Sequence, residues 1–284
     1  DTRCEEALNL VFVGTASNDA AAAVARQEGA TLFAPWAAGD ALHEAAAGAV
    51  FHVRPSMADE ALRMVRHCAT LGQDRLAVLA VDDAMGRAGL AAVSQALTEL
   101  KMPPLVATAT VPPGSDKVEA AAAQVLKGQP QVVIQVALFH TSAAFIRRMR
   151  QSGYGGGFMN FSVVGVDPLF TALGKEVGGV VVSQVVPSPR SPTTPLVREY
   201  LAAIDGTDQT PSYESLEGFI AAKVFAEAVR RAPRGWDRAA LQKTLQGMSD
   251  LDVGGWRVNL RPGVRNAGRA IDLVTLTADG RIIR

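Results

Sequence analysis

The stretch GGVVVSQVVPSPRSPTTP, residues Gly178–Pro195, decides how the rest of the chain is interpreted. Its first half, Val180–Val186, is rich in β-branched residues and is typical of a strand buried on both faces of a parallel sheet. Its second half carries four prolines, which cannot continue a sheet or begin a helix before Pro195. Strands and helices alternate before this stretch, and three helical segments follow it. We therefore predict that the chain crosses here from one domain to another.

Length and composition indicate a globular protein of two domains. The chain has 284 residues, of which 48% are hydrophobic and 20% are charged, and this length exceeds what one small core requires. No apolar run reaches the roughly 18 residues of a membrane-spanning helix, so we predict no membrane span. Lys plus Arg and Asp plus Glu both number 28. That balance argues against a nucleic-acid partner, which needs a basic excess or stripe.

The two cysteines and the first residues leave the cellular compartment open. Cys4 and Cys68 are compatible with a disulfide or with two free thiols, although Cys68 lies on the apolar side of an expected helix. No apolar signal segment opens the chain, so either the protein is cytoplasmic or a signal has been removed. The opening DTRCEEALNLVFVG reads as the end of a helix running into a strand. We therefore expect residues to precede Asp1.

Alternating strand and helix patterns predict an α/β fold with parallel sheets covered by helices. Strands are expected at residues 10–14, 31–35, 51–54, 75–81, 105–111, 131–136, 157–164 and 180–186. Helices are expected at residues 20–28, 90–100, 116–127, 167–173, 195–204, 212–231 and 237–246. Two further helices follow Ser56 and Thr141 as N-caps. Short strands at residues 256–260, 270–277 and 281–284 end the chain, and Asp279-Gly280 makes a hairpin turn between the last two.

The loops at the carboxyl ends of the strands form the candidate site, because ligands of parallel sheets bind there. These loops are residues 15–18, 36–39, 82–86, 138–141 and 161–165. In the first loop, the hydroxyls of Thr15 and Ser17 and free backbone N–H groups at a helix start suit a carboxylate or phosphate. Ordinary N-capping is the alternative, and the same alternative applies to Thr141.

Side chains in three other loops have two interpretations each. Trp36 follows a strand directly and can stack on a ligand or fill an interface between lobes. Phe139 and His140 pair an aromatic ring with a hydrogen-bond donor, whereas a lone histidine is more often structural. Asp82 and Asp83 can bind a cationic group or act as a general base, or they complement the dipole of a helix N-terminus.

The sequence lacks the motifs of common enzymes and metal proteins. Its histidines show no HxxxH or HExxH spacing, and its cysteines are far apart. It has no GxSxG elbow and no phosphate loop, and the glycines at 153–157 precede a strand instead of following one. We find no set of nucleophile, base and orienting residue. We therefore predict a binding protein with no catalytic residue, no metal and no cofactor.

Seven segments, in order, resemble a known family. They are VFVGTASNDAAAAV, TLFAPWAAGDAL, VFHVRPSMADEALRMV, LAVLAVDDAMGRAGLAAVSQAL, AAFIRRMRQSG, GVVVSQVVPSP and PSYESLEGFIAAKVFAEAVRRA. The ordered set is similar to the branched-chain-amino-acid-type substrate-binding proteins of ABC transporters, which are type I periplasmic binding proteins. The resemblance covers essentially the whole chain, and the order of the segments makes it specific.

This resemblance implies a two-lobed receptor, each lobe a mainly parallel sheet flanked by helices, with a small-molecule ligand held between the lobes. Three hinge crossings, near Arg54–Ser56, Val186–Pro189 and Leu251–Gly254, would place residues 1–55 and 187–252 in lobe one. Residues 56–186 and 253–284 would form lobe two. Because the family normally begins with residues that precede Asp1 here, we expect the N-terminal strands of lobe one to be missing from this chain.

The ligand contacts of the family match positions in the strand-end loops. In lobe one, hydroxyls and N–H groups that hold a ligand carboxylate match residues 15–17 and 36–38, although this chain lacks one hydroxyl that relatives often have near Ala37 or Ala38. In lobe two the contacts match Met85, Phe139 and Ser162. Ser162 stands where amino-acid binders can have an acid that pairs with the ligand ammonium, so the resemblance implies an anionic ligand with no obligatory α-ammonium. The predicted ligand-binding set is Thr15, Ala16, Ser17, Trp36, Ala37, Ala38, Asp83, Met85, Phe139, His140 and Ser162.

The function that the resemblance implies is solute delivery in the periplasm. Lobe closure would bury an amino acid-like, carboxylate or amide ligand and present it to the membrane permease subunits of an ABC importer. A sensory or regulatory domain on the same fold is one alternative. An α/β enzyme that uses Asp82, Asp83 and His140 as acid–base groups is another.

Overall fold

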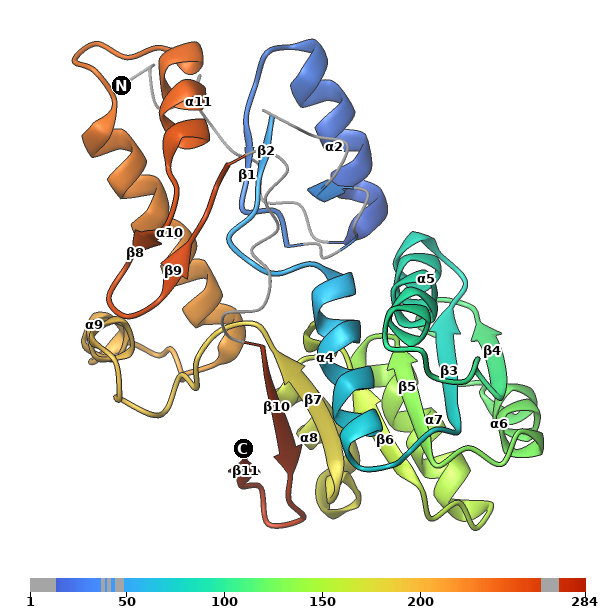
Figure 1. The fold of residues 1–284 in the computed structure, drawn as a ribbon. Helices are drawn as coiled ribbons and strands as arrows, with labels where there is room; N and C mark the ends of the chain where they lie inside the picture. Colours follow the sequence, from blue (N-terminus) through green and yellow to red (C-terminus); the bar gives the residue numbers. More distant parts are fainter. Residues whose placement is uncertain (1–13, 37–38, 40–41, 44–48, 262–270) are drawn as a thin grey trace. The chain divides into compact units, whose positions relative to one another are not determined.

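The computed structural model describes residues 14–36, 39, 42–43, 49–261 and 271–284 (Figure 1). In it, the β-branched run at residues 180–186 begins with a strand, β7 (Val180–Gln184), as predicted. The chain divides into two compact units. Unit 1 contains residues 1–56 and 186–269, and unit 2 contains residues 57–185 and 270–284. The chain therefore leaves unit 2 immediately before the proline-rich segment.

Unit 2 is built on a seven-stranded sheet in the order β11-β10-β7-β6-β5-β3-β4. Strands β3 to β7 are parallel, whereas β10 pairs antiparallel with β7 and β11. A turn at Asp279-Gly280 joins β10 to β11, as predicted. The remaining strands are β3 (Leu76–Val81), β4 (Ala107–Val111), β5 (Val132–Val136), β6 (Gly157–Asn160), β10 (Asp272–Leu276) and β11 (Ile282–Ile283).

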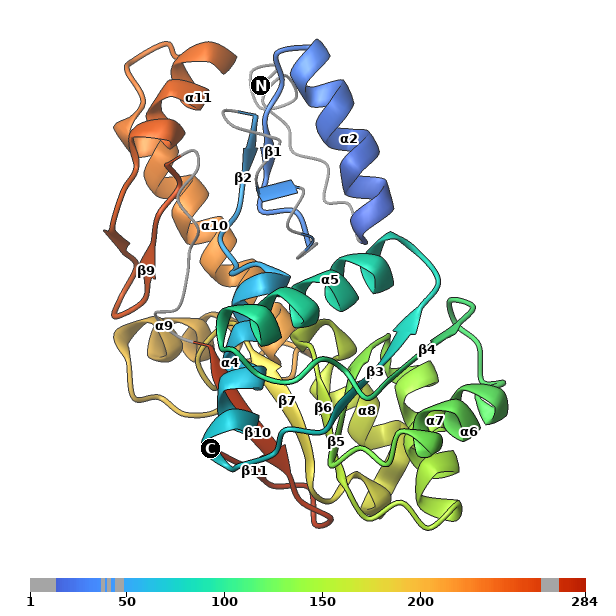
Figure 2. The ribbon, with the colours of Figure 1, turned by 45° about the vertical axis from the view of Figure 1, so that its right-hand side comes forward.

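Helices lie on both faces of this sheet (Figure 2). On one face, Cys68 Sγ of α4 lies 3.6 Å from Met159 Sδ of β6. On the other face, the Arg150 guanidinium of α7 lies 5.7 Å from the ring centre of Phe158, as expected because neighbouring residues of a strand point to opposite faces. The helices of unit 2 are α4 (Met57–Thr70), α5 (Ala84–Glu99), α6 (Glu119–Lys127), α7 (Phe139–Gln151) and α8 (Val166–Leu173), with 3-10 turns η1 (Ser162–Val164) and η2 (Gly174–Val177).

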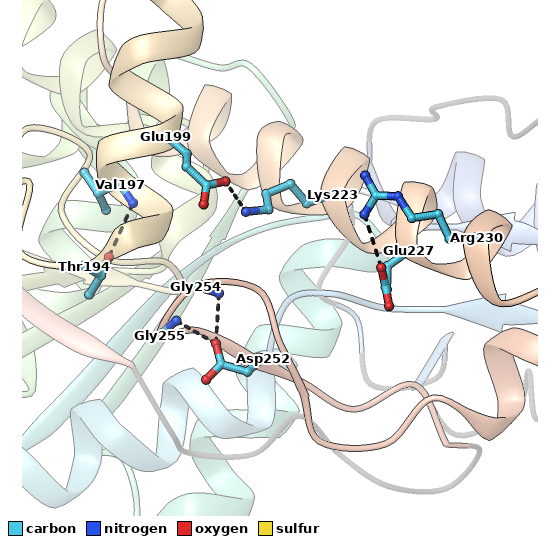
Figure 3. Close-up of polar contacts among 9 residues, drawn as sticks. All are labelled: Thr194, Val197, Glu199, Lys223, Glu227, Arg230, Asp252, Gly254 and Gly255. Carbon is cyan, nitrogen blue, oxygen red and sulfur yellow. Dashed lines mark hydrogen bonds and ion pairs between the residues drawn. The ribbon is translucent and has the colours of Figure 1, made fainter.

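Unit 1 combines residues from before and after unit 2. The ring centres of Phe33 in β1 and Phe225 in α10 lie 5.4 Å apart and join the two parts. Helix α9 begins at Pro195, and the hydroxyl of its N-cap Thr194 accepts from the Val197 N–H (Figure 3). The elements are α2 (Thr15–Gln27), the parallel pair β1 (Leu32–Phe33) and β2 (Val50–Phe51), α9 (Pro195–Ile204), α10 (Tyr213–Arg231), α11 (Arg238–Gly247), and the hairpin β8 (Leu251–Asp252) and β9 (Arg257–Val258).

The segment after β8 remains in unit 1, whereas we predicted a crossing near residues 251–254. Asp252 Oδ1 accepts from the N–H groups of Gly254 and Gly255, at 2.8 and 2.6 Å, and so turns the chain back into β9 (Figure 3). The Gly254 carbonyl then accepts from the Leu196 N–H of α9 at 3.0 Å. These bonds hold residues 251–258 on unit 1, and unit 2 resumes only at Ala270.

Several helices begin earlier than predicted. Helix α2 begins at Thr15 instead of near residue 20, α5 at Ala84 instead of residue 90, and α7 at Phe139, so Thr141 is not an N-cap. Helix α5 contains Gly86, which the prediction left in the loop before the helix. A Cβ at this position would lie 1.7 Å from the Val81 carbonyl oxygen. Here glycine permits close contact between helix and strand and does not mark a turn. The predicted strand at residues 157–164 ends at Asn160 and continues as η1.

Candidate ligand-binding site

The start of α2 presents backbone N–H groups without a side-chain cap. Its N-cap is Gly14, with φ 95° and ψ 152°, a conformation that essentially only glycine adopts. Thr15 and Ser17 lie inside the helix, so neither is its N-cap, and the capping alternative is wrong for this loop. Ala16 and Ser17 are exposed, whereas Thr15 is buried. Such a helix start attracts an anion, because its first N–H groups have no partner within the helix.

Trp36 lies next to the start of α2. The Gly14 N–H donates to the Trp36 carbonyl at 3.3 Å. The Arg54 guanidinium lies 5.9 Å from the centre of the Trp36 ring, and Arg54 Nη1 lies 3.5 Å from Glu217 Oε1 of α10. Sequence reasoning missed Arg54 as part of this cluster. The available signal was an arginine that follows a buried strand by three residues.

Burial controls the charge of His52, which lies two residues before Arg54. The His52 ring stacks on His43 with centroids 3.6 Å apart and planes 15° apart. Burial lowers the pKa of His52 from 6.5 to about 4, and the charge of Arg54 adds a smaller effect in the same direction. The imidazole is therefore neutral at pH 7, and Arg54 is the cation beside Trp36.

In unit 2, Asp83 and Met85 follow the carboxyl end of β3. Asp83 is the N-cap of α5, and its Oδ1 accepts from the Gly86 N–H at 2.9 Å. Asp83 therefore caps the start of α5, where its carboxylate also complements the helix dipole, as in the structural alternative predicted for it. Asp82 is exposed and pairs with Arg87 at 3.7 Å. Met85 is half-buried in the first turn of α5.

Phe139 and His140 follow the carboxyl end of β5. They are the first two residues of α7, and both are exposed. Leu138, the N-cap, is 48% exposed, and Phe139 is 40% exposed. Two neighbouring apolar side chains on the surface form a small patch that suits the apolar part of a ligand.

Ser162 follows the carboxyl end of β6 and contacts an acid that sequence reasoning missed. Glu60 of α4 is fully buried. Its Oε2 accepts from the Ser162 N–H at 2.8 Å, and its Oε1 accepts from the Ser162 hydroxyl at 3.0 Å. Ser183 of β7 also donates to Oε2, at 2.5 Å. The signal for Glu60 was its place on the apolar stripe of α4, four residues before the buried Met64.

The structure brings the predicted residues together within each unit. In unit 1, the start of α2, Trp36 and Gly39 are neighbours, since a Cβ on Gly39 would lie 2.9 Å from Thr15 Cγ2. In unit 2, the residues after β3, β5 and β6 share one edge, because these strands are parallel neighbours in the sheet. Ala37 and Ala38 lie outside the described residues, as does Cys4.

Within the ranges that the structure describes, no group of three or more His, Cys, Asp or Glu residues could hold a metal ion. In the same ranges, no helix is both long enough and apolar enough to cross a membrane. In each unit, the candidate residues offer hydrogen bonds, charge or apolar surface. These groups can hold and orient a small molecule.

Comparison with protein families gives one match over nearly the whole chain. The family model described as periplasmic binding protein matches residues 5–281. The members of this family are solute-binding proteins and share one fold, in agreement with the resemblance noted in the sequence. A search of curated protein sequences finds no match.

Solved structures give the same fold. A possible leucine/isoleucine/valine-binding protein from Rhodopirellula baltica matches with a TM-score of 0.90 and 27% identity, over 100% of this chain and 79% of that one. A substrate-binding periplasmic protein from Ralstonia solanacearum matches with a TM-score of 0.85 and 28% identity, over 96% of this chain and 78% of that one. A leucine-binding protein from Thermotoga maritima, at 16% identity and a TM-score of 0.86, covers 100% of this chain and 81% of its own, and supports the fold alone.

Proposed function

Because this chain belongs to the periplasmic binding protein family, we propose that it is an extracytoplasmic receptor that captures a small organic solute for an ABC importer. The solute is amino acid-like, with a carboxylate or an amide, and the receptor delivers it to the membrane permease subunits after its lobes close. The main support is the uncapped start of α2 beside Trp36, in a chain whose family binds solutes. Binding without turnover is expected.

In unit 1 we propose that the ligand anion binds at the start of α2. The N–H groups of Thr15, Ala16 and Ser17 are the first of the helix and have no acceptor within it, so they can donate to an anion. Arg54 adds a positive charge beside Trp36 and is itself balanced by Glu217. Ala37 and Ala38 stay in the proposed set because the resemblance to the family implies them.

In unit 2 we propose that the loops after β3, β5 and β6 hold the remainder of the ligand. Met85 and Phe139 supply apolar surface, and Phe139 is exposed at the start of α7. His140 and Ser162 supply polar atoms at the same edge of the sheet. Asp83 contributes by fixing the start of α5, where Met85 lies.

The first test is a thermal-shift and calorimetry screen of the purified protein against amino acids, the matching deaminated acids and their amides. At least one compound should raise the melting temperature and bind with a measurable Kd, because a ligand that binds only the folded state stabilises it. A full-length protein that responds to no member of the screen would contradict the proposal.

A pair of variants then locates the anion site. Thr15→Pro removes one N–H group at the first helical position, where proline is well accepted. Thr15→Val keeps that N–H group and removes only the hydroxyl. We expect the proline variant to lose about tenfold in affinity, since a hydrogen bond to a charged group is worth roughly 1.5–3 kcal/mol. Equal affinities for both variants and the unmodified protein would show that the ligand anion binds elsewhere.

A further inference from the structure

The chain contains two Asp-Gly pairs, and the structure holds them in different turns. Asp205-Gly206 follows α9, and Asp279-Gly280 lies between β10 and β11. An Asp-Gly bond can isomerise without an enzyme, because glycine has no side chain to shield its backbone nitrogen from the neighbouring carboxyl group. Both pairs are exposed to solvent. Any difference in their reactivity must therefore come from the turns and their hydrogen bonds.

Asp205 and Gly206 occupy the two central positions of a type II β-turn. Asp205 has φ −60° and ψ 134°, and Gly206 has φ 73°, as this turn requires. The Thr207 N–H closes the turn by donating to the Ile204 carbonyl at 3.1 Å. Within the part of the chain that the structure describes, neither the Gly206 N–H nor the Asp205 carboxylate has a hydrogen-bond partner. A Cβ on Gly206 would likewise meet no described atom within 4 Å.

The reacting groups of the second pair are both occupied. The Gly280 N–H closes its own turn by donating to the Thr277 carbonyl at 3.0 Å. The Asp279 carboxylate accepts at Oδ1 from the Thr277 hydroxyl and at Oδ2 from Arg281 Nε, the latter at 2.7 Å. A Cβ on Gly280 would lie 3.1 Å from Cζ of Phe170 in α8, so this turn packs against its own unit.

We propose that Asp205 is a site of spontaneous isomerisation to isoaspartate in the folded protein, whereas hydrogen bonds protect Asp279. The Gly206 nitrogen attacks Cγ of the protonated Asp205 carboxyl group. The N–Cγ bond forms, the nitrogen loses its proton, and one carboxyl oxygen leaves as water. Water then opens the resulting succinimide ring, and opening at the former main-chain carbonyl gives isoaspartate, in which the chain runs through Cβ and Cγ. The water released in the first step is taken up in the second, so the mass does not change.

Ring closure costs more at Asp279 than at Asp205. Rotation of the peptide after Asp205 disturbs the exposed, neutral bonds that the N–H and hydroxyl of Thr207 make to the preceding carbonyl. At Asp279 the same step must release bonds to a charged carboxylate, which are roughly twice as strong as neutral ones. The hydrogen bonds from Thr277 and Arg281 also lower the pKa of Asp279. Less of its carboxyl group is therefore protonated and ready to lose water at a given pH.

The test is incubation of the folded protein in mildly acidic buffer for several weeks, followed by digestion and mass spectrometry that separates isoaspartyl from aspartyl peptides. Isoaspartate should form at position 205 at least about tenfold faster than at position 279, because hydrogen bonds to a charged group must first break at Asp279. In the urea-unfolded chain the two rates should become similar. Asp205→Glu keeps the charge but cannot form the succinimide ring, so it should remove the product at position 205.

Two variants test the protection of Asp279. Arg281→Ala removes the Nε donor but keeps the backbone bonds between residues 277 and 281, and Thr277→Val removes the hydroxyl donor. Each should accelerate isomerisation at position 279 and leave the rate at position 205 unchanged. Isoaspartate that forms no faster at position 205 than at position 279 in the folded protein, or a difference that persists in urea, would overturn the inference. These measurements need no ligand, so their outcome is independent of the proposed function.

Discussion

Acid should destabilise unit 1 through one buried histidine. His52 is 7% exposed and stacks on His43, and its pKa falls from 6.5 to about 4 mainly because burial disfavours the charged imidazole. The folded-state pKa thus lies below the unfolded-state value. Between pH 6.5 and 4 the unfolded chain binds more protons at this site, so the stability of the folded state decreases as the pH falls through this window.

The size of the effect follows from the shift. The pKa difference is 6.5 − 4 = 2.5, and at 1.36 kcal/mol per pKa unit it corresponds to a loss of about 3 kcal/mol once the pH is below 4. This is a large part of the roughly 5–15 kcal/mol that stabilises a typical domain. Other groups titrate in the same range, so the contribution of His52 must be measured as a difference between variants.

Urea unfolding followed by tryptophan fluorescence isolates unit 1, because all three tryptophans, Trp36, Trp236 and Trp256, belong to it. His52→Phe keeps a planar ring beside His43 but cannot bind a proton. Between pH 7 and pH 4 the unmodified protein should lose about 3 kcal/mol more unfolding free energy than this variant. Parallel pH profiles for the two proteins would refute the assignment of a neutral, buried His52.

Three further predictions concern packing and burial. Glu217→Gln removes one charge from the ion pair with the buried Arg54. It should lower the unfolding free energy of unit 1 by about 3 kcal/mol in the same urea assay. A change below about 0.5 kcal/mol would mean that water screens the pair. Gly86→Ala places a Cβ 1.7 Å from the Val81 carbonyl oxygen and should cost at least about 2 kcal/mol by circular dichroism, whereas Gly218→Ala, on an exposed and open position of α10, should stabilise by up to about 1 kcal/mol. Cys68 is a free, buried thiol, and burial raises its pKa to about 11. Its alkylation at pH 8, measured by peptide mass spectrometry, should occur only as fast as unit 2 unfolds. Rapid labelling of the folded protein would contradict the burial of Cys68.

The overall architecture could be predicted from the sequence because its strands are almost fully buried. Runs such as Leu76–Val81 and Val132–Val136 are buried along their whole length, and a run of this kind between amphipathic helices has few alternatives to a parallel sheet. The prolines after residue 186 likewise exclude a continued strand and a helix before Pro195. Helix α9 accordingly begins at Pro195, as predicted.

The polar details of the site were harder to predict, since they depend on contacts between residues far apart in sequence. Glu60 and Ser183 are separated by 123 positions, and no local pattern indicates that they meet. The start of α2 was placed too late because Thr15 and Ser17 resemble caps, whereas the actual cap is a glycine in a special backbone conformation. The hairpin at residues 251–258 is different, because a local contact turns the chain: the Asp252 carboxylate accepts from the N–H groups of Gly254 and Gly255.

The position of β10 at the side of β7 has a consequence for synthesis on the ribosome. The parallel part of the sheet, β3 to β7, comes from residues 76–184, but β10 is made only after all of α9, α10 and α11. Until residues 272–276 emerge, the outer side of β7 presents unpaired N–H and C=O groups, which invite pairing with a foreign strand. Nascent chains stalled before residue 272 should therefore aggregate or recruit chaperones more than chains that contain residues 272–284.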